Sequence, residues 1–229
     1  MRLKQKIVIA IDGPAASGKS TTAKLLAKKL DYIYIDTGAM YRAFTLKVLS
    51  ENLLEHLLAD EAQLWQFVEK TDVRLTDTKV WLDGRDVTEE IRSNEVSKLV
   101  SKISALKPVR EKLSAIQKKL GEAKGVVMDG RDIGTAIFPT AELKIYMMAS
   151  ARERARRRYA ELKSKNADIS LDALEVEIKQ RDEEDMNRAV SPLRKADDAV
   201  VLDTSSLTIE EQVEHIYRLA LDKLNILKV

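Results

Sequence analysis

The fold is decided by one stretch near the N-terminus, Ile7-Val-Ile-Ala-Ile-Asp-Gly-Pro-Ala-Ala-Ser-Gly-Lys-Ser20. Its first five residues are apolar and mostly β-branched, which favours a short strand buried on both faces. The segment from Gly13 to Ser20 matches G-x-x-x-x-G-K-[S/T], whose glycines let backbone N–H groups wrap around phosphate oxygens. A helical pattern follows to about Leu30, so the positive end of that helix points at the same phosphates. We therefore expect a strand, a phosphate-binding loop and a helix, with ATP as the ligand of the loop.

The loop pattern also assigns roles to single residues. Lys19 is predicted to reach the β- and γ-phosphates, and the Ser20 hydroxyl to ligate Mg²⁺. A second apolar stretch, Gly125 to Met128, ends in Asp129, whose carboxylate would reach the Mg²⁺ shell through a water molecule. The alternative, a buried strand that merely ends in Asp at a turn, stays open. The complete set expected to bind ATP is Asp12, Gly13, Pro14, Ala15, Ala16, Ser17, Gly18, Lys19, Ser20, Thr21 and Arg157.

Short apolar runs alternate with helical patterns along most of the chain. Strands are predicted at 7–11, 32–35, 125–128, 143–148 and 199–202, which implies an α/β fold with a five-stranded parallel sheet flanked by helices. Residues 71–92 break this pattern, because turn residues at 77–78 and 83–84 separate three short runs typical of a small antiparallel meander. Thr208 and Glu211 form a capping box that begins the last helix. We expect a single domain over residues 1–229 with an inserted lobe.

Composition excludes several classes of protein. The chain has 229 residues, 45% hydrophobic and 33% charged, with a formal net charge of +2 and no cysteine. Disulfides and cysteine metal sites are therefore impossible, and the charge gives no general footprint for nucleic acid. No apolar run approaches the roughly 20 residues of a membrane span. These features favour a cytoplasmic protein, and we expect a monomer without nucleic-acid or membrane partners.

Arginines gather in two places. The first set lies on a predicted helix after the fourth strand and comprises Arg152, Arg154, Arg156, Arg157 and Arg158. The second set lies on a predicted helix over 171–187 and comprises Arg181, Asp182, Asp185 and Arg188. Such runs are often only solvated surface. Transfer between two phosphates, however, requires positioned cations and no general base, because the accepting phosphate is already largely dianionic near pH 7. Both histidines lie outside the motifs, so the pattern favours nucleotide-to-nucleotide phosphoryl transfer.

Three segments resemble the bacterial cytidylate kinase family: Asp36-Thr-Gly-Ala-Met-Tyr-Arg42, Asp129-Gly-Arg-Asp-Ile-Gly-Thr135 and Arg181-Asp-x-x-Asp-x-x-Arg188. The resemblance implies a P-loop kinase that phosphorylates CMP and dCMP with ATP and Mg²⁺. It also implies a core at about 1–40, 105–150 and 165–229, a nucleoside monophosphate-binding insert at about 41–104, and an arginine-rich helical lid at about 151–164.

The resemblance further implies the residues that bind the acceptor. Thr37, Tyr41 and Arg42 would line the CMP site beside Asp36, with Arg42 on the phosphate. The cytosine would be faced by Ser101, Arg110 and Asp132. Arg131 and Arg188 would clamp phosphate, while Arg181 and Asp185 would hold the sugar. The residues expected to assist catalysis are Lys19, Arg131, Arg154, Arg158, Arg181 and Arg188.

Some alternatives stay open at this stage. Tyr41 could belong to the hydrophobic core, Ser101 to the surface of a helix, and Arg110 to an ordinary first helical turn. The acceptor could be another monophosphate such as UMP or AMP. A protein of a different class, an RNA-linked NTPase whose 152–158 arginines meet nucleic acid, would show salt-sensitive RNA binding.

Overall fold

A computed structural model describes residues 6–76, 79–163 and 169–226 of the chain. Two compact units are present: the first combines Met1–Tyr34 with Ala123–Val229, and the second is Ile35–Glu122. The insert predicted at 41–104 falls inside the second unit, and its role in nucleotide binding stays a prediction.

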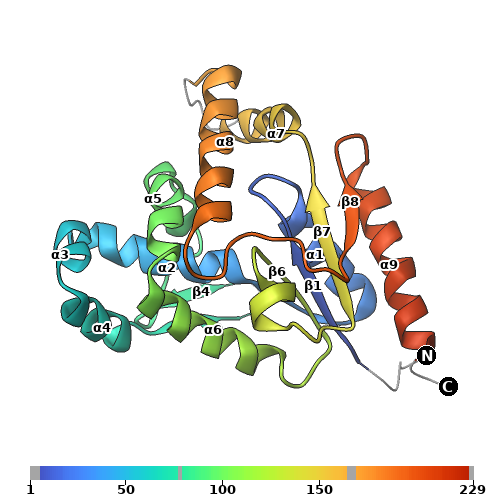
Figure 1. Cartoon of the computed structure of the whole chain (residues 1–229), viewed down its shortest axis with the longest axis horizontal. Coiled ribbons are helices and arrows are strands. Elements are labelled where there is room, and N and C mark those ends of the chain that lie inside the picture. The colour runs from blue at the N-terminus through green and yellow to red at the C-terminus, as the bar shows by residue number, and fades with distance from the viewer. Residues whose placement is uncertain (1–5, 77–78, 164–168, 227–229) are drawn as a thin grey trace. The chain divides into compact units, whose positions relative to one another are not determined.

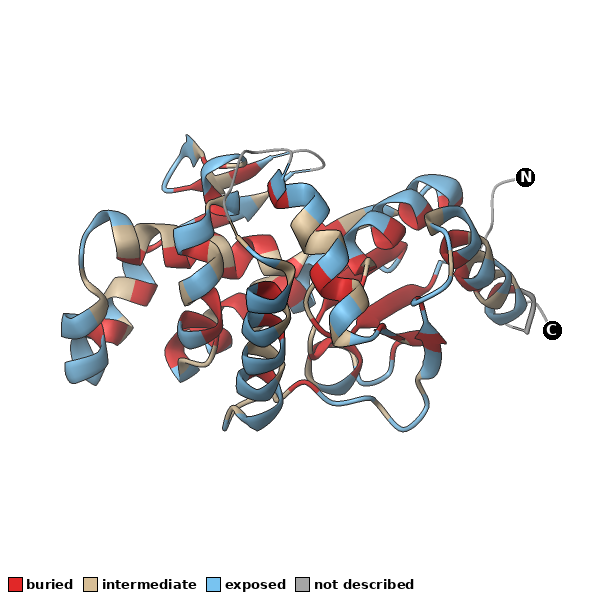
Figure 2. Cartoon of the chain, turned by 90° about the horizontal axis from the view of Figure 1, so that it is seen from above, coloured by how far each residue is buried: buried red, intermediate tan, exposed pale blue. Residues whose placement is uncertain are grey.

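The first unit is built on a parallel sheet, which confirms the predicted fold class (Figure 1). The strands of this sheet are β2 (Ile33–Asp36), β6 (Val126–Gly130), β1 (Val8–Asp12), β7 (Leu143–Met148) and β8 (Val200–Asp203), in this spatial order, and the first unit includes β2 only as far as Tyr34. Strands β1 and β6 are buried along their whole length, and Figure 2 shows strands of the sheet in the colour of buried residues. Asp12 of β1 lies in register with Gly130 of β6 and with Tyr146 of β7. The loops that follow β1 and β6 therefore leave from the same edge of the sheet.

Helices α1 (Lys19–Leu30) and α9 (Ile209–Ile226) cover one face of this sheet. The side chains of Ile11, Ile145 and Met147 pack there with both helices, so alternate strand residues such as Asp12 and Tyr146 point to the other face. The predicted capping box begins α9: the Thr208 N–H donates to Glu211 Oε2 at 2.8 Å, and the Glu211 N–H donates to Thr208 Oγ1 at 3.2 Å.

Two further helices of the first unit carry the arginine sets. They are α7 (Ala151–Lys163) and α8 (Leu171–Asn187), which pack together through Ala155, Leu162, Leu174 and Ile178. A five-residue π-helical turn, η2 (Ile133–Ile137), follows β6. The segment that carries Arg131 and Asp132 is thus held between β6 and η2.

The second unit is mostly helical. Its elements are α2 (Thr37–Ser50), α3 (Leu54–Ala59), α4 (Glu61–Lys70), β3 (Val73–Leu75), β4 (Val80–Leu82), β5 (Arg85–Asp86), η1 (Glu90–Arg92), α5 (Asn94–Ser104) and α6 (Lys107–Gly121). Strands β3, β4 and β5 pair antiparallel in chain order, which confirms the predicted meander. The predicted turn at 77–78 lies outside the described residues.

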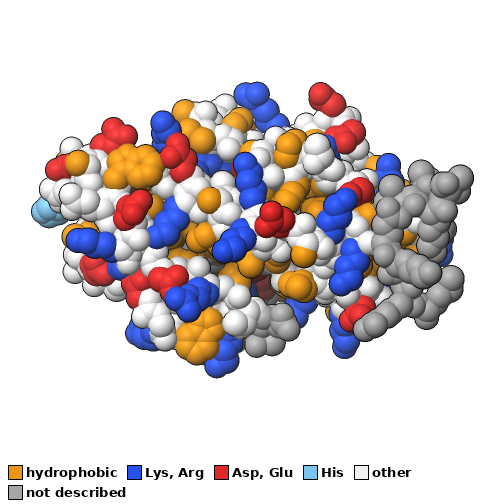
Figure 3. Space-filling model, turned by 90° about the horizontal axis from the view of Figure 1, so that it is seen from below, with side chains coloured by type: hydrophobic (Ala, Val, Ile, Leu, Met, Phe, Trp, Pro, Cys, Tyr) orange, Lys and Arg blue, Asp and Glu red, His pale blue; other side chains and the backbone are white. Residues whose placement is uncertain are grey.

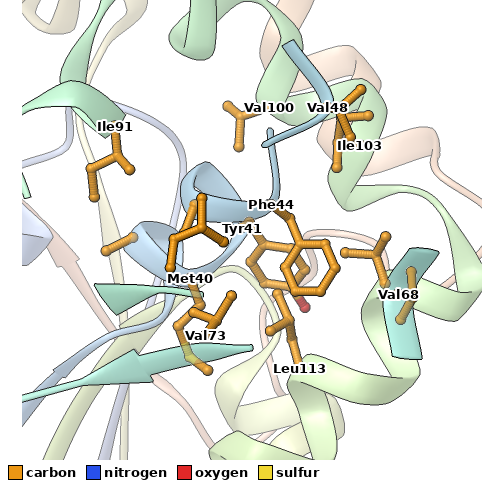
Figure 4. Packing of buried hydrophobic residues seen from close by; sticks show 14 of the residues in the cluster. Met40, Tyr41, Phe44, Val48, Val68, Val73, Ile91, Val100, Ile103 and Leu113 are labelled. Carbon is orange, nitrogen blue, oxygen red and sulfur yellow. The ribbon is translucent and has the colours of Figure 1, made fainter. Parts of the chain in front are cut away.

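The core of the second unit surrounds α2 (Figure 4). The Phe44 and Phe67 rings meet edge to face with centroids 6.4 Å apart, and the Tyr41 ring is buried in the same cluster. Tyr41 therefore does belong to the core, yet the Arg110 guanidinium lies 5.3 Å from its ring centroid. A cation held over an aromatic face keeps its remaining donors available for other partners.

No helix among the described residues is long and apolar enough to cross a membrane. On the face drawn in Figure 3, Lys and Arg side chains are interspersed with Asp and Glu. This mixture matches the small net charge of the chain and gives that face no continuous basic track.

Candidate active site

The phosphate loop has the backbone that its glycines predict. Gly13 has φ 148°, and a Cβ atom there would lie 2.0 Å from the backbone oxygen of Met147 on β7. Gly18 has φ 93° and immediately precedes α1. Ala16 also has a positive φ, 58°, which an L-residue rarely adopts. The loop is consequently wound tightly against the sheet, with the positive end of α1 behind it.

Lys19 is folded back onto this loop. Its Nζ donates to the Pro14 carbonyl at 2.7 Å and to Ser17 Oγ at 3.3 Å, and its side chain is buried. Burial and the nearby Arg131 cation lower the pKa of Lys19 to about 7, against the opposing attraction of Asp129. An ammonium group held at the centre of the loop can move from these neutral acceptors to a phosphate oxygen.

The affinity for ATP is expected to fall as the pH rises through about 7. Above that pH ligand-free Lys19 is mostly neutral, whereas a bound polyanion raises its pKa, so binding takes up a proton and weakens by up to about tenfold per pH unit. Calorimetry with a non-hydrolysable ATP analogue measures this slope, and Lys19→Met isolates the lysine contribution. An unchanged slope in that variant would contradict the assignment.

Ser20 and Asp129 meet beside the loop. The Ser20 hydroxyl donates to Asp129 Oδ2 at 2.8 Å, and the Tyr34 hydroxyl donates to Asp129 Oδ1 at 2.9 Å. Asp129 is buried, and the two hydroxyl groups hold its carboxylate in place. A serine hydroxyl and one fixed carboxylate are the protein donors that fit Mg²⁺, which takes its other ligands from phosphates and water.

Asp12, which the sequence pattern placed with the ATP-binding residues, receives two backbone hydrogen bonds. Its Oδ1 accepts from the Ile133 N–H at 2.8 Å and its Oδ2 from the Gly134 N–H at 2.7 Å. Burial raises the pKa of this carboxyl group to about 7, although the two N–H donors oppose the shift.

The second arginine set forms a compact ionic cluster with the segment after β6. Arg131 Nε donates to Asp185 Oδ2 at 2.8 Å, and Arg188 NH2 donates to Asp132 Oδ1 at 3.3 Å. Burial opposes the charge of Asp185, but the surrounding Arg131, Arg181 and Arg188 cations hold its pKa below the usual range. The structure thus brings together the acids and arginines of two predicted motifs, 50 or more residues apart in sequence. Such an excess of fixed positive charge suits a phosphate-bearing ligand.

The arginines of α7 have different surroundings. Arg154 is buried: its Nε donates to the Ala149 carbonyl at 3.0 Å, and its NH1 donates to the Ala15 carbonyl at 3.2 Å. Its two terminal nitrogens also grip Asp182 in a two-point pair at 3.0 and 2.5 Å. Arg158, one turn further along, donates to Glu161 Oε2 at 2.9 Å. Arg154 and Arg158 were predicted to act alike, and the structure places Arg154 in contact with the phosphate loop.

Arg157 connects the phosphate loop to the residue after β8. Its NH1 donates to the Ser17 carbonyl at 3.2 Å, and its NH2 donates to the Thr204 carbonyl at 2.6 Å. The buried Thr204 hydroxyl also donates to the Ser17 carbonyl at 3.0 Å. Arg157 therefore contacts the predicted ATP-binding loop, and its own contact with ATP stays a prediction. Thr21, by contrast, is exposed on α1.

The remaining predicted residues lie in the second unit. Asp36 caps α2 by accepting from the Ala39 N–H at 2.9 Å, and the next residue, Thr37, is buried. Arg42 NH1 donates to Ser97 Oγ at 2.8 Å and to the Ile91 carbonyl at 3.3 Å, which ties α2 to η1 and α5. Arg110 NH1 donates to the Ser104 carbonyl at 3.0 Å.

Ser101 is not a serine on the exposed surface of a helix, which was the alternative left open by the sequence. It is 8% exposed, and its hydroxyl oxygen is buried without a hydrogen-bond partner among the described residues. A buried hydroxyl without a partner costs free energy, so its retention indicates a ligand or an ordered water molecule.

Several residues of the site were missed by the sequence analysis. Tyr34 orients Asp129, Thr204 supports the loop, and Ser97 holds Arg42. Asp182 was noted only as one member of a charged cluster. None of the four has a local signal, because each role depends on a partner that is distant in sequence.

Comparison with known proteins agrees with this geometry. The family model described as cytidylate kinase matches residues 9–222. A cytidylate kinase of Chloroherpeton thalassium is 60% identical over 99% of this chain and 98% of its own length. Those of Chlorobaculum tepidum and Pelodictyon phaeoclathratiforme are 56% and 54% identical, over 94% and 95% of this chain and 93% and 96% of their own lengths.

Proposed function

Because this chain belongs to the cytidylate kinase family, we infer that it transfers the γ-phosphoryl group of ATP to the phosphate of CMP and dCMP. The observation that carries this inference is the ionic cluster of Arg131 and Arg188 around the buried Asp185, in the unit that also holds the phosphate loop. A hydrolase acting on water would not need so many fixed cations beyond the loop. A kinase must neutralise a second phosphate group as well.

The chain's own residues divide the work. The loop from Gly13 to Ser20 would hold the ATP phosphates through its backbone N–H groups, and Lys19 would follow the γ-phosphoryl group during transfer. Arg131 and Arg188 would orient the accepting phosphate, whose oxygen attacks in line without a general base. Ser20 and Asp129 would hold Mg²⁺, which when bound neutralises charge on the ATP phosphates.

The second unit supplies the proposed recognition of the pyrimidine. Its buried Ser101 hydroxyl and the Arg110 guanidinium over Tyr41 are polar groups that can pair with the base edges of cytosine. Arg42 would meet the nucleotide phosphate after exchanging its Ser97 contact.

A coupled assay across CMP, dCMP, UMP, AMP, GMP and dTMP tests the function directly. CMP and dCMP should give the highest kcat/KM. Preference for UMP or AMP would move the assignment to another monophosphate kinase, the alternative from within the same class. RNA-stimulated hydrolysis without any monophosphate acceptor would support the RNA-linked NTPase, which the family membership does not favour.

Replacing Arg110 by methionine is expected to raise the KM for CMP by roughly 10- to 150-fold, which corresponds to the loss of one hydrogen bond from a charged group, about 1.5–3 kcal/mol. The stem of methionine keeps the packing over Tyr41 while removing the charge. Steady-state kinetics with each substrate varied in turn supply the measurement. The KM for ATP should stay near its original value, and an equal rise in both KM values would refute a role in cytosine binding.

A further inference from the structure

One carboxylate joins the two loops that leave the sheet edge. Asp12 is the last residue of β1 and directly precedes the phosphate loop, whereas Ile133 and Gly134 directly follow Arg131 and Asp132. The hydrogen bonds of 2.8 and 2.7 Å use both carboxylate oxygens, one for each N–H group. Asp12 is 5% exposed, so solvent cannot substitute for either bond.

The two N–H groups belong to the first turn of η2. The π-helical bonds of this turn begin further on, with the Ile137 N–H on the Asp132 carbonyl at 3.2 Å and the Phe138 N–H on the Ile133 carbonyl at 2.7 Å. The first N–H groups of any helix lack acceptors within the helix, and here a carboxylate from another strand accepts them. When Asp12 is ionised, these bonds are charge-assisted, which places them among the stronger hydrogen bonds in proteins.

Gly134 permits the close approach. A Cβ atom there would lie 3.3 Å from Asp12 Oδ2 and 3.2 Å from Cδ of Lys144. Lys144 is itself fixed, because its ammonium group pairs with Asp198 at 2.8 Å. The turn is therefore seated between two anchored side chains, and neither can move away without losing its own bonds.

We propose that Asp12 is a positioning residue that couples the phosphate loop to the segment carrying Arg131 and Asp132. It acts through the backbone of η2 instead of through contact with ATP. The proposal rests on the proposed function, since it concerns the relative placement of the donor loop and the arginines that neutralise the accepting phosphate. Reacting groups displaced by about 1 Å lose roughly 100-fold in rate, so a rigid tie between the two loops has direct catalytic value.

The discriminating variant is Asp12→Asn in the full chain. The amide presents one NH2 group where an oxygen now accepts an N–H at short range, so two donors face each other and one bond is lost. We expect kcat to fall roughly 100-fold with a higher KM for CMP and an unchanged dissociation constant for ATP, because only the arginine-bearing segment is displaced. Amide hydrogen exchange at Ile133 and Gly134 should accelerate, while the strand amides of β1 and β6 stay protected.

Asp60→Asn is the matched control. Asp60 also accepts two backbone N–H groups, those of Ala62 and Gln63 at 2.9 and 3.1 Å, but it caps the exposed start of α4. Its replacement should change neither kcat nor either KM. Gly134→Ala disturbs the same contact from the other side and should change kcat and the KM for CMP in the same direction as Asp12→Asn by a smaller factor, which keeps the test decisive if that variant fails to fold.

Two results would overturn the proposal. One is an affinity for ATP that falls as far as kcat, which would make Asp12 a ligand of ATP. The other is unchanged exchange at Ile133 and Gly134 in Asp12→Asn. The hydrogen-exchange measurement tests the tie between Asp12 and η2 without CMP. A wild-type protein that phosphorylates no monophosphate would refute the proposed function and would leave the exchange result unaffected.

Discussion

Replacing Lys19 by alanine is expected to lower kcat by roughly 1,000-fold or more, because its ammonium group is the one cation within Gly13–Ser20 and would stabilise charge that develops on the transferred phosphoryl group. The fold should persist. Lys19 is buried beside Arg131, and its lowered pKa shows that its charge is unfavourable in the ligand-free protein. Removing it should therefore leave the Tm unchanged or slightly higher.

Single-turnover rates and a thermal melt check both parts of this expectation. Lys24→Ala is the matched control, since Lys24 lies on the same helix but is exposed, and it should have wild-type kinetics. A Lys19→Ala protein with a near-normal rate would remove Lys19 from the mechanism. A large fall in Tm would instead show that the lysine is structural.

Replacing Asp182 by alanine is expected to destabilise the protein by about 3–5 kcal/mol, the usual consequence of leaving one partner of a buried ion pair alone. The Asp182 and Arg154 side chains are only 14% and 6% exposed, so water cannot take over the guanidinium donors. Arg154 would also lose the alignment that brings it to the Ala15 carbonyl of the phosphate loop. Urea unfolding measures the loss of stability, and the kcat of the folded protein should fall as well.

Two further variants separate stability from catalysis in this pair. The double variant Arg154→Met with Asp182→Leu removes both charges and should recover most of the stability. If Arg154 assists phosphoryl transfer, as the family resemblance predicts, the kcat of the double variant should remain low, whereas full recovery of kcat would assign Arg154 a structural role alone. Asp172→Ala is the control, because Asp172 pairs Arg152 across the same two helices but is 85% exposed and should have no measurable effect on stability.

Strands β1 and β6 were predictable because they are buried along their whole length. Continuous apolar runs locate such strands without any tertiary information, and the observed bounds of these two strands differ from the predicted ones by one residue or two. Helix α8 has the predicted bounds of 171–187. The glycines and the lysine of the phosphate loop were equally predictable, since the sequence motif specifies the local backbone conformation directly.

The partners of the polar residues were not predictable from local pattern. Arg154 and Arg158 share one face of α7, yet they pair with different acids. Arg154 pairs with Asp182 of α8, and Arg158 pairs with Glu161 of its own helix. Ser101 looked like any helical serine until its burial was known. Asp12 matched the start of a phosphate loop, but its bonds to η2 depend on the pairing of β1 with β6.

The position of Gly13 also limits how this chain can vary. What would obstruct a side chain there is the backbone oxygen of Met147, and every amino acid carries that atom. No replacement of Met147 could therefore make room for a larger residue at position 13, so a compensating second mutation on β7 is unavailable. In a randomised library this site would be constrained independently of the residues around it, unlike the neighbouring core positions, where one side chain can shrink as another grows.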